Sequence, residues 1–296
     1  MELRVLRYFL MAAREENITK AAQLLHVTQP TLSRQLMQLE EELGVRLFHR
    51  SRHNIVLTDE GMLLKRRAQE LVSLADKTKR ELSREEGAVT GEIAIGSGEL
   101  HSVQFLAEML ASFRKRYPLI HYEFYSGNSD NIKERIERGI LDIGILLEPV
   151  EMQKYDFLRL PAREVWGVLV HQESALAAKE SVEPQDLLGT PLMMTKRELA
   201  RSELANWFGD LYDRLEIIAS YNLLYNIAML VQKNMGAALC LKLDSLYEDL
   251  CFVPLAPPLT TNAVFAWKKN QAVSPATSLF IEHIKKCIKG ICDHVT

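Results

Sequence analysis

The chain has 296 residues, of which 47% are hydrophobic and 25% are charged. This composition is typical of a soluble globular protein, and the length allows two or three domains with ample core. The formal net charge of −3 excludes a protein that binds nucleic acid through a basic surface on all sides, so any such contact depends on a local basic patch.

The N-terminal segment, MELRVLRYFLMAAREEN, predicts a helix. Acidic residues at Glu2, Glu15 and Glu16, together with the absence of a small-residue cleavage site, distinguish it from a signal peptide. No run of the chain approaches the roughly 18 apolar residues that a transmembrane helix requires. We therefore expect a cytoplasmic protein with no membrane partner.

Residues 18–50 contain the most informative pattern, two short helical segments joined by a tight turn at 26–28. Thr28 is a good N-cap for the second segment, and Pro30 suits a first turn, where backbone N–H groups have no partner. Ala21 and Ala22 in the first segment are small enough for two helices to cross closely. The pattern predicts a helix-turn-helix that reads DNA.

The second segment has one apolar and one polar face. Its leucines recur at 4-3-4 spacing and predict a buried stripe of Leu32, Leu36, Leu39 and Leu43. The polar face is also compatible with an ordinary amphipathic helix, but the preceding alanine-rich helix favours DNA reading by side chains that reach base edges and phosphates. The candidate DNA contacts on this segment are Thr28, Gln29, Pro30, Thr31, Ser33, Arg34 and Gln38.

The segment after Gly44, a plausible helix stop, contains two short apolar runs around a basic tip. It predicts a β-ribbon wing that brings Arg50, Arg52 and His53 to phosphates. We expect Glu40, Glu41 and Glu42 to turn away from the DNA or to pair with neighbouring subunits. The expected basic patch comprises Arg34, Arg46, Arg50, Arg52, Lys65, Arg66 and Arg67.

Residues 1–66 resemble the winged helix-turn-helix of LysR-type transcriptional regulators, and the rest of the chain is similar to that family more loosely. The matching residues are Ala21, Ala22, Leu25, His26, Val27, Thr28, Gln29, Pro30, Ser33, Leu39, Glu40, Leu43, Gly44, Leu47, Phe48, Arg50, Leu57, Thr58, Glu60 and Gly61. The resemblance implies a regulator that binds double-stranded promoter DNA, responds to a small-molecule effector, assembles as a homodimer or homotetramer, and acts on RNA polymerase.

A long helix is predicted from about residue 58 to 83, capped by Thr58 or Asp59. Its residues at 4-3-4-3-4 spacing form a coiled-coil seam: Leu64, Ala68, Leu71, Ala75, Thr78 and Leu82. The alternative is a helix packed on its own domain. The length and the family resemblance favour a dimerisation strut.

The pattern becomes α/β after a hinge at 87–91. Strands are predicted at 92–95, 120–125, 141–146, 165–171, 191–195, 215–219, 236–241, 251–255 and 264–268, and helices at 103–117, 128–138, 202–210, 223–233 and 276–292. The alternation implies a largely parallel sheet with helices on both faces. We expect the chain to cross between two lobes near Leu160-Pro161 and near residues 257–262.

The predicted fold class is thus an N-terminal α winged helix-turn-helix, a long linker helix and a C-terminal α/β bilobal effector domain, which by resemblance is like that of periplasmic binding proteins. The expected boundaries are 1–58 for the DNA-binding domain, 59–86 for the linker or dimerisation helix, 91–161 with 266–296 for lobe 1, and 162–265 for lobe 2.

A cleft between the lobes, at the carboxyl ends of strands, is the expected effector site. Helix N-termini there favour an anion such as a carboxylate, and Lys196 or Arg197 is a candidate counter-charge, although Glu99 opposes an anion unless it points away or pairs with His101. The candidate effector-binding residues are Ser97, Gly98, His101, Ser102, Asn128, Ser129, Thr195, Lys196, Tyr221 and Asn222. As an alternative, Ser102, Asn128, Ser129 and Asn222 are helix caps.

No catalytic motif is present, and no cofactor or metal is expected besides the unidentified effector. The sequence contains no nucleophile–base motif, and Gly96-Ser97-Gly98 is not followed by the lysine of a phosphate-binding loop. A solute-binding transport protein is the other candidate for the α/β part, and the DNA-binding module at the front argues against it. We expect a regulator rather than an enzyme.

The four cysteines show no metal-binding or C-x-x-C spacing. They are Cys240, Cys251, Cys287 and Cys292. Reduced thiols in or near packed surfaces are the favoured interpretation, and a redox-sensing pair is the alternative.

Overall fold

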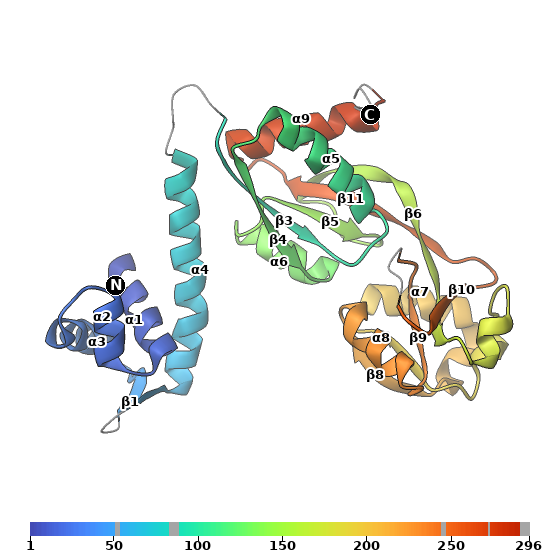
Figure 1. The fold of residues 1–296 in the computed structure, drawn as a ribbon, viewed down its shortest axis with the longest axis horizontal. Helices are drawn as coiled ribbons and strands as arrows, with labels where there is room; N and C mark the ends of the chain where they lie inside the picture. The colour runs from blue at the N-terminus through green and yellow to red at the C-terminus, as the bar shows by residue number, and fades with distance from the viewer. Residues whose placement is uncertain (51–53, 83–88, 244–246, 272, 291–296) are drawn as a thin grey trace. The chain divides into compact units, whose positions relative to one another are not determined.

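The structure, a computed structural model, describes residues 1–50, 54–82, 89–243, 247–271 and 273–290. The chain forms two compact units, Met1–Ser83 and Arg84–Thr296 (Figure 1). Among the described residues, none of the helices combines the length and apolar character that crossing a bilayer requires.

The first unit is a winged helix-turn-helix followed by a long helix. Its elements are α1 (Leu3–Glu15), α2 (Ile18–Leu24), α3 (Gln29–Leu43), the hairpin β1 (Phe48–Arg50) and β2 (Ile55–Leu57), and α4 (Asp59–Leu82). Ala21 and Ala22 are almost fully buried in the core between the helices, so the predicted close helix crossing is confirmed.

The ends of α3 follow the predicted local chemistry. The Thr31 N–H donates to Thr28 Oγ1 over 3.4 Å, Pro30 lies in the first turn, and Gly44 ends the helix at a φ of 68°. His26 turns the chain between α2 and α3 with a φ of 54°. The buried stripe is confirmed except at Leu43, the last residue of the helix, which is 38% exposed.

Helix α4 packs on its own unit along one face. Ala68 is fully buried, Leu64 and Val72 lie against the same core, and Arg7 of α1 forms an ion pair with Asp76. The single seam predicted from the heptad spacing is therefore wrong for Leu64 and Ala68, which pack within the unit. A separate apolar face of α4 is exposed and comprises Leu63, Leu71 and Leu74.

The second unit is built on one nine-stranded sheet with strand order β4-β3-β5-β11-β6-β9-β7-β8, in which β10 also pairs with β6. Lobe 1 contains β3 (Gly91–Ser97), α5 (Val103–Arg116), β4 (Ile120–Ser126), α6 (Ser129–Glu137), β5 (Ile143–Leu147), β11 (Thr260–Lys268) and α9 (Pro275–Ile288). Lobe 2 contains β7 (Leu192–Thr195), α7 (Glu198–Phe208), β8 (Ile217–Tyr221), α8 (Leu224–Gln232), β9 (Ala237–Leu241), β10 (Leu250–Pro254) and the 3-10 helices Ala175–Ala178, Pro184–Leu187 and Gly209–Arg214.

Strand β6 (Tyr155–His171) belongs to both lobes. Its first part pairs with β11 and its last part with β9 and β10. The predicted strand at 165–171 is therefore only the lobe 2 end of a longer strand. The chain returns to lobe 1 in β11, whose Ala263 and Phe265 lie in the lobe 1 core. Strand β11 begins at Thr260, within the predicted crossing at 257–262, so lobe 1 resumes before the predicted boundary at residue 266.

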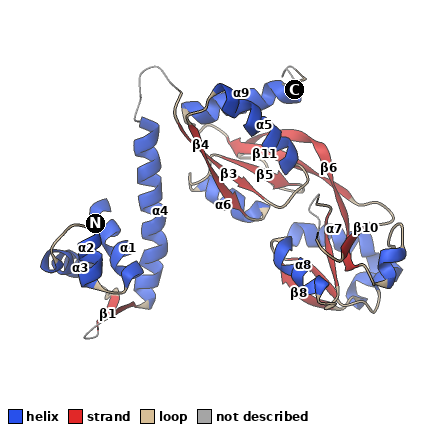
Figure 2. Cartoon of the chain, in the orientation of Figure 1, coloured by secondary structure: helices blue, strands red, loops and turns tan. Residues whose placement is uncertain are grey.

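Helices cover both faces of the sheet (Figure 2). In lobe 1, Ile93 and Ile95 of β3 face the core formed with α5 and α9, whereas Ala94 faces α6. Gly144 of β5 allows α6 to lie close to the strands, since a Cβ there would come within 2.5 Å of Ile132. This packing fixes the strand ends that carry the loops described below.

The largely parallel sheet is confirmed in the outer parts and wrong in the centre. Strands β3, β4 and β5 are parallel, as are β7, β8 and β9, because helical crossovers join them. The central pairs of β11 with β5 and of β6 with β9 are antiparallel. Strands β6 and β11, which connect the lobes, form this antiparallel centre of the sheet.

Candidate functional site

The first candidate site is the exposed face of α3. Thr28, Gln29, Pro30, Thr31, Arg34 and Gln38 are exposed, and Ser33 is half-buried. These side chains lie away from the leucines that pack into the core, as a helix that enters a major groove requires. The amide of Gln35 donates to the Gln38 carbonyl over 3.0 Å, which orients the Gln38 side chain on this face.

The wing follows directly from α3. Strand β1 pairs antiparallel with β2, with His49 opposite Val56 and Arg50 opposite Ile55. Arg52 and His53, the other predicted phosphate contacts, lie outside the described residues.

Glu40 supports the wing rather than turning away from the unit. Its carboxylate accepts hydrogen bonds from the Leu47 N–H at 2.8 Å and the Phe48 N–H at 3.2 Å. This contact is compatible with the expectation that Glu40 turns away from the DNA, which stays a prediction. Glu42 pairs with the N-terminal ammonium group of Met1.

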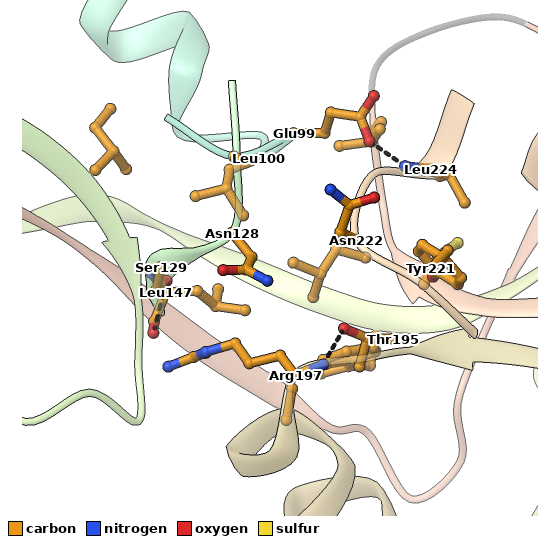
Figure 3. A pocket seen from close by; sticks show the side chains of 18 residues that line it. Glu99, Leu100, Asn128, Ser129, Leu147, Thr195, Arg197, Tyr221, Asn222 and Leu224 are labelled. Carbon is orange, nitrogen blue, oxygen red and sulfur yellow. Dashed lines mark hydrogen bonds between the residues drawn. The ribbon is translucent and has the colours of Figure 1, made fainter. Parts of the chain in front are cut away.

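The second candidate site is a pocket between the lobes of the second unit, with a cavity volume of about 90 Å³ (Figure 3). It lies at the carboxyl ends of parallel strands, where the loops after β3 and β4 in lobe 1 meet those after β7 and β8 in lobe 2. Its lining consists of Gly98, Glu99, Leu100, Gly127, Asn128, Ser129, Ile145, Leu147, Trp166, Thr195, Arg197, Ala200, Tyr221, Asn222, Leu224, Cys240, Leu241 and Leu243.

The polar side chains on the lobe 1 side combine structural and pocket-facing roles. The Asn128 carbonyl oxygen caps α6 by accepting from the backbone N–H groups of Asp130 and Asn131 at 3.1 and 3.0 Å. Its amide nitrogen is directed toward the middle of the pocket in Figure 3. Ser129 Oγ accepts from the Leu147 N–H at 2.8 Å. The cap and the ligand-site interpretations are thus compatible for Asn128.

The polar side chains on the lobe 2 side are held by the backbone. Thr195 Oγ1 accepts from the Arg197 N–H at 3.2 Å, and the Tyr221 hydroxyl donates to the Leu239 carbonyl over 2.6 Å. Burial raises the pKa of Tyr221, with smaller contributions from Cys240 and Glu99. Tyr221 therefore remains a neutral hydroxyl.

Arg197 reaches from the start of α7 across to lobe 1. Its side chain donates to the Pro149 carbonyl and lies 3.7 Å from a carboxylate oxygen of Asp130. The residue is 4% exposed, and its Nε and one terminal nitrogen have no hydrogen-bond partner. Burial lowers the pKa of the guanidinium group, although Asp130 and Glu203 counter this effect.

Trp166 adds another donor without a partner. Its indole Nε1 is buried and forms no hydrogen bond, and the residue lines the same pocket. A buried donor without a partner costs free energy, on the order of 1–3 kcal/mol. Arg197 and Trp166 both line the pocket, and each has a buried donor nitrogen without a hydrogen-bond partner.

Two family models match the chain. The model described as "LysR substrate binding domain" matches residues 86–287, and the model described as "Bacterial regulatory helix-turn-helix protein, lysR family" matches residues 3–62. The first covers more than half of the chain. The chain belongs to the LysR family.

Relatives of full length support this assignment. The Hca operon transcriptional activator HcaR of Escherichia coli is 28% identical, with 98% of this chain and 99% of HcaR covered. The transcriptional regulator YvbU of Bacillus subtilis is 26% identical, with 97% and 98% covered. The crystal structure of CbnR, a LysR family transcriptional regulator, has the same fold, with a TM-score of 0.77, 20% identity and coverage of 99% and 100%.

This LysR-type transcriptional regulator therefore consists of a DNA-binding helix-turn-helix unit and an effector-binding unit, and it is a regulator rather than an enzyme. Its effector domain has the two-lobed α/β fold expected from the sequence. The described residues contain no cluster of three or more His, Cys, Asp or Glu side chains placed to hold a metal ion.

The structure places part of the predicted effector set elsewhere. The residues that line the pocket are Gly98, Asn128, Ser129, Thr195, Tyr221 and Asn222, whereas Ser97, His101, Ser102 and Lys196 do not. Lys196 is exposed, and its neighbour Arg197 takes the inward position, since adjacent residues in extended chain point to opposite sides.

The N-terminus of α5 is already occupied by a carboxylate of the protein. Glu164 of β6 is fully buried and accepts from the backbone N–H groups of His101 and Ser102, each at 2.9 Å, and from Ser102 Oγ at 2.5 Å. Ser102 is held by Glu164 and does not line the pocket, so its contact with an effector stays a prediction. The alternative that Ser102 caps the helix was wrong, because its hydroxyl donates to Glu164 and forms no cap bond.

Sequence reasoning missed Trp166 and Glu164. Both lie on β6, Glu164 directly before the predicted strand at 165–171 and Trp166 within it. The signal available was a lone acidic residue directly before the apolar run of a strand, at the point where the chain crosses between lobes.

The thiols differ from the favoured expectation at one position. Cys240 and Cys251 are free, and burial raises the pKa of Cys240 to about 12, so this pocket-lining thiol is unreactive. Cys287 is disulfide-bonded, so the expectation of four reduced thiols was wrong. Cys292 lies outside the described residues.

Proposed function

We propose that this regulator binds a small effector in the pocket between the lobes, and that a carboxylate or another acceptor group of the effector meets Arg197 and Trp166. The observation that supports this most strongly is the set of buried donors without partners on these two residues. A carboxylate accepts charge-assisted hydrogen bonds from a guanidinium group. The cavity of about 90 Å³ favours a ligand no larger than a single ring, since an engineered cavity of about 150 Å³ holds one benzene.

The effector would act by changing how the two lobes are held together. Arg197 of lobe 2 contacts Pro149 and Asp130 of lobe 1, so a ligand at Arg197 competes with or reinforces an inter-lobe contact. A ligand that binds one lobe arrangement better shifts the population toward it. We propose that this shift alters the placement of the DNA-binding units on promoter DNA in the cytoplasm, and thereby the recruitment of RNA polymerase.

A thermal-shift screen of small mono- and dicarboxylates on the full chain tests the effector proposal. A ligand bound only to the folded state raises the melting temperature. Arg197→Gln should abolish the shift, whereas the exposed neighbour Lys196→Gln should retain it. Ala200→Trp, which fills the pocket, should also abolish it. Shifts that persist in both Arg197→Gln and Ala200→Trp would place the site elsewhere.

We also propose that the exposed apolar face of α4 is a dimer interface. Leu63, Leu71 and Leu74 are 54%, 42% and 40% exposed on a helix whose other face is already packed. Contiguous exposed apolar side chains on a helix favour a partner helix. Two α3 helices in one dimer would read paired half-sites.

Leu71→Asp tests the dimer. The charge would be buried without a partner in the interface, whereas the isolated unit keeps its fold because Leu71 is half exposed. We expect a smaller species in analytical ultracentrifugation and weaker binding to paired half-sites. Gln69→Asp, an exposed change elsewhere on α4, should leave the oligomer intact. An unchanged oligomer for Leu71→Asp would contradict the proposal.

A further inference from the structure

Glu99 lies on the opposite side of the pocket from Arg197 (Figure 3). It follows β3 in lobe 1, and its carboxylate accepts a hydrogen bond from the Leu224 N–H at the first residue of α8 in lobe 2. No side chain of α8 caps this helix itself. Glu99 therefore takes the place at the α8 N-terminus that a ligand carboxylate would otherwise occupy.

The charge of Glu99 affects two residues of the pocket wall. It contributes to the raised pKa of both Tyr221 and Cys240, after burial as the main cause. These two residues line the pocket. The charge of Glu99 therefore favours a cationic ligand group beside it and disfavours an anionic one.

The Glu99 carboxylate retains capacity for a second donor. An ionised carboxylate has about four lone-pair sites, and Leu224 N–H uses one oxygen. At the other end of the pocket, the positive charge of Arg197 is partly balanced by Asp130 and Glu203. A ligand with a net negative charge would add negative charge near Glu99, Asp130 and Glu203. A zwitterionic ligand adds no net charge.

We propose, on the basis of the proposed function, that the effector is a small aminocarboxylate whose carboxylate meets Arg197 and whose ammonium group meets Glu99. Glu99 is then the residue that selects an ammonium-bearing ligand over the matching simple carboxylate. The lining also includes apolar side chains that accommodate a short hydrocarbon segment of the ligand. They are Leu100, Ile145, Leu147, Leu224, Leu241 and Leu243.

Matched pairs of probes on the full chain test this inference. The pairs are β-alanine with propanoate and 4-aminobutanoate with butanoate. We expect at least one aminocarboxylate to raise the melting temperature and to bind, by calorimetry, about tenfold or more tightly than its partner without the amino group, since a hydrogen bond between charged groups has that effect.

The variant Glu99→Gln separates charge from shape. Glutamine has nearly the same size and keeps an acceptor oxygen for the Leu224 N–H, so the lobes remain joined. It should remove or reverse the preference for the aminocarboxylate. The control Glu108→Gln removes a carboxylate from an exposed position on α5 that does not line the pocket, and it should leave the preference unchanged.

Failure of this inference is distinguishable from failure of the proposed function. If simple carboxylates bind, Ala200→Trp abolishes their binding, and no aminocarboxylate binds more tightly, the pocket is the effector site and the assignment of Glu99 is overturned. The same holds if Glu99→Gln leaves the preference intact. If no probe of either class gives a shift that Ala200→Trp abolishes, both proposals fail.

Discussion

The DNA-binding unit caps helices from nearby side chains, whereas the effector-binding unit combines local caps at Asn128 and Ser274 with distant ones. In the first unit, Asn17, Thr28 and Thr58 cap α2, α3 and α4 by accepting from N–H groups three residues further along the chain. In the second unit, Glu164 and Glu99 serve α5 and α8 from positions 62 and 125 residues away. Local caps fix each helix independently, whereas distant caps connect a helix to another strand or lobe.

This difference has a functional consequence. A DNA-reading helix has to keep its shape while it contacts a rigid partner, and local capping ensures this. An effector unit has to couple ligand binding to the relative position of its lobes. The contact between Glu99 and Leu224 N–H and the contact between Arg197 and Pro149 both join the lobes and both lie at the pocket.

The largest expected effect comes from removing the distant cap at α5. Glu164→Ala removes the acceptor of the buried Ser102 N–H and hydroxyl and of the half-buried His101 N–H, at a cost of about 3 kcal/mol. Urea unfolding followed by tryptophan fluorescence measures it, because Trp166, Trp207 and Trp267 all lie in the second unit.

The control for this prediction is Glu123→Ala, an exposed carboxylate on β4, which should cost little. A loss for Glu164→Ala as small as that of the control would mean that the distant cap does not stabilise the effector unit.

The next effect concerns DNA affinity alone. Gln29→Ala and Arg34→Ala should each weaken operator binding by about 2 kcal/mol if these side chains contact base edges. Both are exposed, so the free energy of unfolding should not change. Fluorescence anisotropy with an operator duplex measures the affinity, and Gln23→Ala on the exposed side of α2 is the control. Undiminished affinity in both variants would show that α3 is not the helix that reads the DNA.

The smallest effect compares two local caps. Thr28→Ala and Asn128→Ala should each cost about 1 kcal/mol of stability. Asn128 also faces the pocket, so only its replacement should weaken the effector response. Asn128→Ser should restore the cap without restoring the response, as measured by unfolding and by thermal shift with an active ligand. Full recovery of the response in Asn128→Ser would show that Asn128 acts only as a cap.

Much of the first unit was predictable because its chemistry is local. The cap at Thr28, the proline at position 30 and the stop at Gly44 depend on neighbours within one helical turn. The exposed end of the leucine stripe at Leu43 and the contact of Glu40 with the wing were not predictable, because they depend on what the rest of the unit covers.

In the second unit, hydrophobic periodicity placed most strands and helices, and the rule that ligands bind at the carboxyl ends of parallel strands indicated the loops of the pocket. Asn128, Thr195 and Tyr221 were found in this way. The sequence did not determine the direction of each side chain. Lys196 and Arg197 were equal candidates for the effector's counter-charge, and only the structure shows that Lys196 points outward and Arg197 inward.

The sequence by itself determined the family, the DNA-reading helix, the α/β character of the effector unit and the loops that form its pocket, since each depends on residues close together in the chain. Only the tertiary structure decided which polar groups are satisfied. Glu164 fills the α5 N-terminus and Glu99 the α8 N-terminus, while Arg197 and Trp166, which line the pocket, keep buried donors without a hydrogen-bond partner. Hydrogen-bond partners separated by tens of residues depend on strand order and lobe packing, which no local pattern encodes.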